Sequence, residues 1–194
     1  MVSQEVVDRV KKFINFYGPS KNLEDVPNEY FEKYDGVLPL ELLVLWGNLG
    51  FGNYGGGVVK LIDPDLFKKN LDKWRRKEDD NAYPFMITAF GDMYYLWKLP
   101  DGSEEVRLIS IIYKKEKLCT KSFADFISNY IISKDAIDND LKASIYIKAE
   151  GKYGALSNDD IYTFVPSVSE GGKETVDSIQ IADAYIYQDI AYGD

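Results

Sequence analysis

The sequence of 194 residues contains no histidine and one cysteine, Cys119. Without histidine, the chain cannot supply the imidazole base of a Ser-His or Cys-His catalytic pair. With one cysteine, a zinc site would need carboxylates for its remaining ligands, and an internal disulfide is excluded. The commonest forms of nucleophilic and zinc catalysis are therefore not expected here, and nothing requires an oxidising compartment.

Long hydrophobic runs are also missing. The longest apolar stretch, residues 38–45, is interrupted by Pro39 and Glu41 and is far too short to span a bilayer. The N-terminus lacks the basic-then-apolar order of a signal peptide. We therefore expect a cytoplasmic protein without a membrane segment.

Positive charge is scarce relative to negative charge, and the imbalance is uneven along the chain. The net charge is -9, yet residues 122–194 hold 13 acidic and 5 basic residues, whereas residues 1–121 hold 19 and 18. Such an acidic half repels nucleic acid and attracts a basic partner. The alternative interpretation is that the acidic residues only keep the protein soluble.

Apolar residues at helical or strand spacing indicate the fold class. The pattern predicts helices over residues 6–17, 27–34, 40–46, 64–74, 123–131 and 141–153. It predicts strands over residues 58–62, 85–90, 93–97, 106–113 and 161–168. The helix that follows Asp63 and Pro64 is expected to bury Leu66, Phe67, Leu71 and Trp74. We predict an α+β fold, an antiparallel sheet flanked by helices, with a smaller α/β C-terminal portion.

The polar stretch 133–140 is interpreted as a linker, which divides the chain into domains 1–132 and 133–194. The second domain stands alone or docks on the first as one body. Ser157 and Asp160 have the spacing of a capping box, which predicts that a short helix begins there. Residues 175–192 mix helical and extended signals.

Two motifs suggest ligand sites but fail in their context. GFGNYG at 50–55 matches the dinucleotide fingerprint, yet a helix is predicted before it and a strand after it, the reverse of what that site needs. Its glycines fit the end of a helix and a turn. Asp135, Asp138, Asn139 and Asp140 lack the central glycine and distal glutamate of a calcium loop. We therefore predict no cofactor and no metal.

A series of short segments runs through the sequence in a recognisable order. They are LPLELLVLW at 38–46, GFGNYG at 50–55, DP at 63–64, TAFGD at 88–92, LW at 96–97, YGAL at 153–156, DIYTFVP at 160–166 and GG at 171–172. In this order the chain resembles GAD-like domain proteins joined to the C-terminal domain of type VI secretion immunity proteins, the partners of secreted DNase toxins. The family offers no established catalytic residues to transfer.

This resemblance and the acidic C-terminal half lead to one functional hypothesis. The chain is expected to be a cytoplasmic immunity protein, not an enzyme, that binds a cognate protein toxin, a basic nuclease, and occludes its active site. It would bind neither nucleic acid nor membrane. The candidate contacts are the acidic residues Asp138, Asp140, Asp159, Asp160, Glu170 and Asp177. The alternatives are a small histidine-independent carboxylate hydrolase or a regulatory ligand-binding module.

Overall fold

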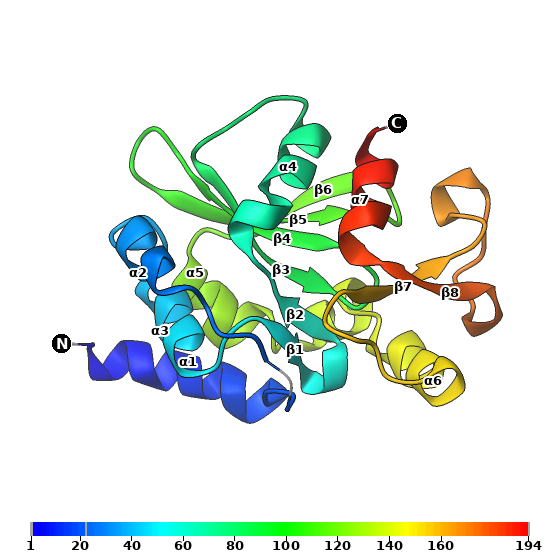
Figure 1. The fold of residues 1–194 in the computed structure, drawn as a ribbon, viewed down its shortest axis with the longest axis horizontal. Helices are drawn as coiled ribbons and strands as arrows, with labels where there is room; N and C mark the ends of the chain where they lie inside the picture. Colours follow the sequence, from blue (N-terminus) through cyan, green and yellow to red (C-terminus); the bar gives the residue numbers. More distant parts are fainter. Residues whose placement is uncertain (1, 22, 194) are drawn as a thin grey trace.

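The computed structural model describes residues 2–21 and 23–193 and has the predicted α+β fold (Figure 1). Its centre is a six-stranded sheet in which the strands follow the order of the chain and every neighbouring pair is antiparallel. The strands are β1 (Gly52–Tyr54), β2 (Val59–Leu61), β3 (Ala82–Thr88), β4 (Met93–Lys98), β5 (Glu104–Ser110) and β6 (Lys115–Thr120).

Helices flank this sheet on both faces (Figure 1). They are α1 (Gln4–Tyr17), α2 (Asn28–Tyr34), α3 (Leu40–Asn48), α4 (Pro64–Arg75), α5 (Phe123–Asp125), α6 (Ala143–Tyr153) and α7 (Ala184–Gly193). Neighbouring side chains of β4 identify the two faces, because they alternate along a strand. The Tyr94 ring packs against Phe126, just after α5, with 5.0 Å between ring centroids. The Tyr95 ring lies under the guanidinium of Arg75 in α4.

Local signals in the sequence explain where the predicted helices begin. Ser3 caps α1, because its hydroxyl accepts a hydrogen bond from the Val6 N–H at 3.4 Å. Asp63 caps α4 in the same way through the Asp65 N–H at 2.8 Å, with Pro64 as the first helical residue. None of the helices in the two described ranges is long and apolar enough to cross a membrane.

The C-terminal portion packs onto the central sheet. It contains α6, a two-stranded sheet of β7 (Asp160–Phe164) and β8 (Ile179–Asp183), and α7. The Tyr162 N–H of β7 donates to the Ala89 carbonyl at 2.8 Å, and the buried amide of Gln188 in α7 donates to the Gly91 carbonyl at 2.8 Å. One hydrophobic core runs through both portions of the chain. A domain boundary after residue 132 stays a prediction.

The sequence patterns missed one strand and gave two wrong local predictions. Strand β6 was not predicted, because most of its side chains are polar and exposed at the edge of the sheet. The stretch 133–140 is not a solvated linker, since Ala136–Asp140 forms a helical turn in which Asp140 is only 4% exposed. No helix begins after Ser157; its hydroxyl donates to the Asp160 carboxylate at 2.7 Å, and Asp160 starts β7.

Candidate functional site

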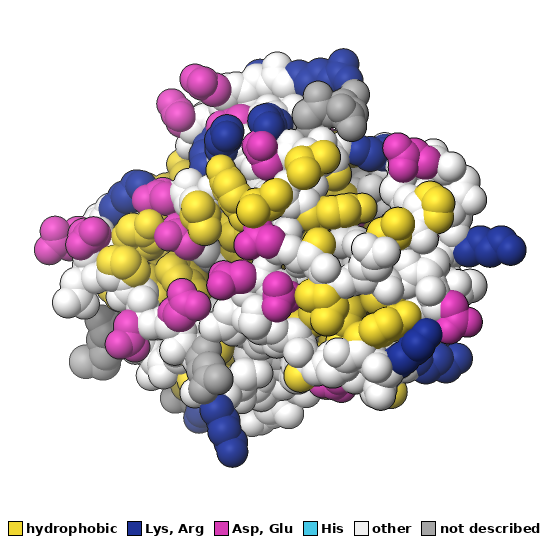
Figure 2. Space-filling model, turned by 45° about the vertical axis from the view of Figure 1, so that its right-hand side comes forward, with side chains coloured by type: hydrophobic (Ala, Val, Ile, Leu, Met, Phe, Trp, Pro, Cys, Tyr) yellow, Lys and Arg dark blue, Asp and Glu magenta, His cyan; other side chains and the backbone are white. Residues whose placement is uncertain are grey.

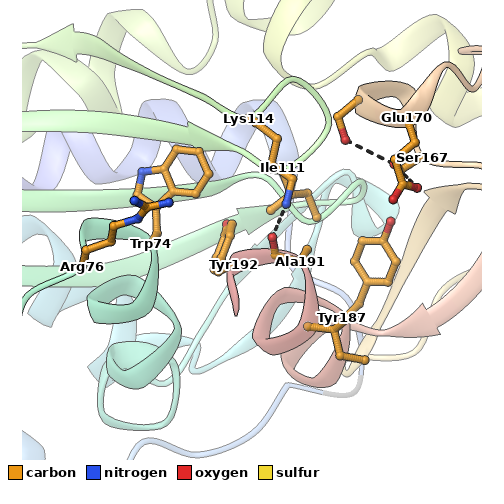
Figure 3. A pocket seen from close by; sticks show the side chains of 11 residues that line it. Trp74, Arg76, Ile111, Lys114, Ser167, Glu170, Tyr187, Ala191 and Tyr192 are labelled. Carbon is orange, nitrogen blue, oxygen red and sulfur yellow. Dashed lines mark hydrogen bonds between the residues drawn. The ribbon is translucent and has the colours of Figure 1, made fainter. Parts of the chain in front are cut away.

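Two hollows flank α7. The first, which we call the acidic groove, has a volume of about 310 Å³. Its carboxylates are Glu24, Asp63, Asp159 and Asp183, its exposed apolar edges are Leu66 and Ile186, and its floor includes Phe51 and Phe67. The second, which we call the cleft, has a volume of about 730 Å³ and is lined by Trp74, Arg76, Lys114, Ser167, Glu170 and Tyr187, among others (Figure 3).

The GFGNYG motif builds one wall of the acidic groove. Gly50 has a φ of +114°, and a Cβ atom on it would lie 2.2 Å from the carbonyl oxygen of Glu24. The absence of a side chain allows Glu24 and Phe51 to exchange two backbone hydrogen bonds of 2.9 Å. The first glycine of the motif therefore brings the Glu24 carboxylate to the edge of the groove.

The third residue of the motif, Gly52, lies against Asn158 in the opposite wall of the groove. Gly52 has a φ of +118°, and a Cβ atom on it would lie 2.9 Å from Oδ1 of Asn158. Asn158 donates from Nδ2 to Oε1 of Glu24 at 3.2 Å. The motif follows the helix α3 and contains the strand β1, so the helix comes before the strand, as the sequence predicts. Its glycines permit the close approach of two chain segments.

A buried lysine, Lys60, is hydrogen-bonded to the segment that forms the same wall. Lys60 is 0% exposed, and its ammonium donates to the Ser157 carbonyl at 2.7 Å and to Oδ1 of Asn53. Burial lowers the pKa of Lys60 to about 8, while the nearby carboxylates of Asp160 and Asp159 act in the opposite direction. The lysine thus ties the acidic segment 157–160 to the central sheet.

The carboxylates of the groove lack cationic partners. Within residues 2–21 and 23–193, no lysine or arginine forms an ion pair with Glu24, Asp63, Asp159 or Asp183. The pKa of Asp159 is raised, first by partial burial and then by the like charges of Glu24, Asp183 and Asp160. The nearby ammonium of Lys60 acts in the opposite direction on Asp159, but it forms no ion pair with the groove, which keeps an excess of negative charge.

Exposed apolar side chains lie beside these carboxylates. Leu66 on α4 is 51% exposed and Ile186 on α7 is 58% exposed. Ile190, one helical turn after Ile186, is 62% exposed but lines the cleft. The prediction that Leu66 is buried was wrong, because α4 turns Phe67 and Leu71 toward the core. Figure 2 shows acidic side chains gathered across the middle of one face, with exposed hydrophobic side chains next to them.

The cleft differs from the groove in its charge. Arg76 and Lys114 line it together with Glu170, so both signs are present. The Lys114 ammonium donates to the Ala191 carbonyl at the end of α7, and Ser167 donates to the Glu170 carboxylate at 2.7 Å (Figure 3). Lys114 and Ser167 are thus hydrogen-bonded within the protein, whereas the buried hydroxyl of Tyr192, which also lines the cleft, has no hydrogen-bond partner among the described residues.

The six predicted contact residues do not form one surface. Asp159 lies in the groove and Asp160 follows it, whereas Glu170 lines the cleft. Asp138 and Asp177 pair elsewhere, with Lys134 and Lys152. Sequence reasoning missed Glu24, Asp63 and Asp183 as residues of the groove.

Asp140 is corrected, because it is buried and cannot meet a partner at the surface. Its carboxylate accepts hydrogen bonds from the hydroxyls of Tyr94 at 3.1 Å and Tyr130 at 2.8 Å, and it pairs with Lys117. It holds the turn Ala136–Asp140 against the central sheet.

The chemistry available to the site is limited. No group of three or more His, Cys, Asp or Glu side chains suited to a metal ion occurs in the part of the chain that the structure describes. Burial raises the pKa of the Cys119 thiol to about 12, so this thiol is protonated at neutral pH. What the groove offers is a rigid surface of carboxylates and aliphatic side chains.

Comparison with known families accounts for the first portion of the chain. The sequence matches the GAD-like domain over residues 8–111, which is more than half of its length. The chain belongs to the GAD-like domain family. The matched part supplies Glu24, Phe51 and Asp63 to the groove, whereas Asp159 and Asp183 lie outside it. The immunity-type C-terminal domain stays a prediction.

A solved structure shares the fold of both portions. The crystal structure of Atu4351 from Agrobacterium tumefaciens is similar, with a TM-score of 0.71 and 16% sequence identity. The similarity covers 94% of this GAD-like protein and 88% of that chain. No curated protein matches the sequence. At this identity the likeness shows that the central sheet and the C-terminal portion occur together in one fold.

Proposed function

We propose that this GAD-like protein is an immunity protein that neutralises a cognate secreted toxin, a nuclease, by binding it and blocking its active site. One observation carries the proposal: the carboxylates of the acidic groove form no ion pair within residues 2–21 and 23–193, and they lie beside exposed Leu66 and Ile186. A nuclease must present positive charge to bind the phosphates of its substrate. The groove complements such a surface in charge, and its apolar edges supply contact area.

Neutralisation would require no chemical step. Carboxylates of the groove would take the place of substrate phosphates at the toxin's basic surface, while Leu66 and Ile186 would exclude water around them. Opposite charges would also accelerate association, and this acceleration would weaken as salt is added.

The resemblance to immunity proteins of type VI secretion indicates where the toxin is encoded, because immunity genes lie beside toxin genes. The test expresses the neighbouring candidate toxin in cells with and without this protein. We expect cell death without it and survival with it, and we expect the two purified proteins to form a stable complex in which nuclease activity is lost. Survival of cells that lack the protein, or full nuclease activity of the toxin in its presence, would reject the proposal.

A matched pair of variants connects this outcome to the groove. The triple substitution Glu24→Gln, Asp159→Asn and Asp183→Asn removes three charges while retaining the polar shape of each side chain. Glu170→Gln removes one charge from the cleft. We expect the groove variant to bind the toxin at least 100-fold more weakly and to lose protection. We expect the cleft variant to protect as well as the natural sequence. Thermal unfolding of both variants shows whether they are folded.

A further inference from the structure

The acidic groove has an apolar floor and a charged mouth, and this combination restricts what it can hold. Phe51 and Phe67 are buried beneath it, at 7% and 6% exposure, and Leu66 and Ile186 flank it. Its volume of about 310 Å³ lies at the lower end of the range for ligand pockets. A space of this size can hold one long side chain.

The carboxylates at the mouth retain free acceptor capacity. The side chain of Asp183 is used once, as the cap of α7, where Oδ1 accepts the Ile186 N–H at 2.8 Å. Asp63 is used more fully, because its carboxylate accepts the Asp65 and Leu66 N–H groups and the Tyr30 hydroxyl. An ionised carboxylate offers about four lone-pair sites, so Asp183 can still accept from a charged donor.

An occupant with an aliphatic stem and a cationic, planar head matches both features. The stem would lie between Leu66 and Ile186, and the head would meet the carboxylates of Glu24, Asp159 and Asp183. A guanidinium donates to carboxylates through two parallel N–H groups and is less strongly hydrated than an ammonium, so it is the better match for a partly desolvated groove. Arginine is also one of the residues enriched at energetically dominant interface positions.

We propose that the acidic groove is the docking site for a single arginine side chain of a basic protein partner. The identity of that partner rests on the proposed function, whereas the preference of the groove for a guanidinium does not. The side chain enters between Leu66 and Ile186, and its guanidinium bridges carboxylates from the GAD-like portion and from the C-terminal portion. Binding therefore uses both portions of the chain together.

The test titrates the purified full-length protein with three blocked amino acids and follows its backbone amide signals by NMR. The probes are Nα-acetyl-arginine-N-methylamide, the lysine equivalent, and the citrulline equivalent, which is similar in shape to arginine but uncharged. We expect the arginine probe to bind with a dissociation constant in the millimolar range, about −4 kcal/mol, and to shift the amides of residues 158–160 and 183–186. We expect at least threefold weaker binding of lysine and no saturable binding of citrulline.

The variants described above complete the test. The triple groove variant is expected to lose the arginine shifts, and Glu170→Gln is expected to keep them. Equal binding of the three probes, shifts centred on the cleft, or undiminished binding by a folded groove variant would each overturn the proposal. Arginine binding at the groove without toxin neutralisation would reject the proposed function only. Toxin neutralisation that is unaffected by the groove variant would place the toxin contact outside the groove, whereas the arginine titration alone decides whether the groove binds a guanidinium.

Discussion

The acidic groove and the cleft lie on two sides of one helix, α7, yet they differ in how their charged side chains are paired. In the cleft, Lys114 and Ser167 donate to groups of the protein itself, and basic and acidic side chains occur together. In the groove, Asp159 and Asp183 crowd near Glu24 without a lysine or arginine paired to them in the described ranges. Volume alone would favour the cleft, at about 730 Å³ against 310 Å³.

This difference teaches that charge balance, rather than size, distinguishes the two hollows. The pKa of Asp159 is raised first by partial burial and then by the like charges of Glu24, Asp183 and Asp160, with Lys60 acting in the opposite direction. A cationic partner would remove that repulsion, whereas the cleft has no comparable imbalance to relieve. A buried ionisable group bonds to a segment near each hollow: Lys60 donates to the Ser157 carbonyl, and Asp92 accepts the N–H of Ile111, which lines the cleft.

The largest effect is expected from Gly50→Ala, which disrupts the backbone contact between Gly50 and Glu24 at one wall of the groove. The added Cβ would lie 2.2 Å from the Glu24 carbonyl, so the chain around Glu24 must move. We expect the free energy of unfolding to fall by about 4 kcal/mol, measured by urea denaturation. Gly154→Ala is the control, because Gly154 also has a positive φ, +90°, but meets no atom within 4 Å. Equal losses in the two variants would show that Gly50 is needed only for its backbone conformation.

Asp92→Asn tests the buried acid on the cleft side. Desolvation raises the pKa of Asp92 to about 7, although Ser110 and the Ile111 N–H stabilise its charged form. The folded state therefore binds more protons than the unfolded state between about pH 4 and pH 7, and Asp92 makes stability fall as pH rises through this window. We expect the natural protein to lose roughly 3 kcal/mol relative to the asparagine variant across it. Parallel pH profiles of unfolding for the two proteins would contradict this assignment.

Gln188→Ala probes the helix that separates the two hollows. Gln188 is 0% exposed, donates to the Gly91 carbonyl at 2.8 Å and accepts from Asn70 at 3.4 Å. Removing its amide leaves buried polar groups without partners, and we expect a loss of about 2 kcal/mol in thermal or urea unfolding. Ile190→Ala, on the exposed side of α7, should change stability by less than about 0.5 kcal/mol. A loss of unfolding free energy in Ile190→Ala as large as that in Gln188→Ala would mean that other side chains pack over this side of α7.

Lys60→Met tests the buried cation on the groove side. The folded pKa of Lys60, about 8, is lower than its ordinary value of 10.5. The folded state therefore binds fewer protons than the unfolded state between these values, and Lys60 makes stability rise with pH through that window. We expect the natural protein to gain on the order of 1 to 2 kcal/mol relative to the methionine variant between pH 8 and pH 10. No difference between the two profiles would place the ammonium in contact with water.

Much of the fold was predictable because its signals are local. The cap at Asp63, the proline after it and the apolar spacing of α1 lie within a few residues of the structure that they specify. The stretch 133–140 was misread because its buried member, Asp140, is satisfied by Tyr94 and Lys117 from distant strands. Strand β6 pairs at the edge of the sheet with little apolar patterning of its own.

The groove was predictable only in part. Asp159 was among the candidates because the C-terminal half is acidic, but Glu24 and Asp183 come from distant parts of the chain. Their convergence depends on tertiary packing, which single-sequence patterns do not contain. The one available signal was the glycine motif: Gly50 and Gly52 lack side chains where Glu24 and Asn158 approach. These glycines allow close approach of another segment, the backbone of Glu24 at Gly50 and the side chain of Asn158 at Gly52.

Hydrogen exchange of the protein with and without its cognate toxin tests the assignment of the groove most directly. The amides of residues 158–160 and 183–186 are expected to exchange more slowly in the complex, because these residues form the wall and the edge of the groove. The amides of residues 167–170, at the cleft, are expected to exchange at unchanged rates. Protection confined to residues 167–170, with free exchange at residues 158–160, would contradict the assignment.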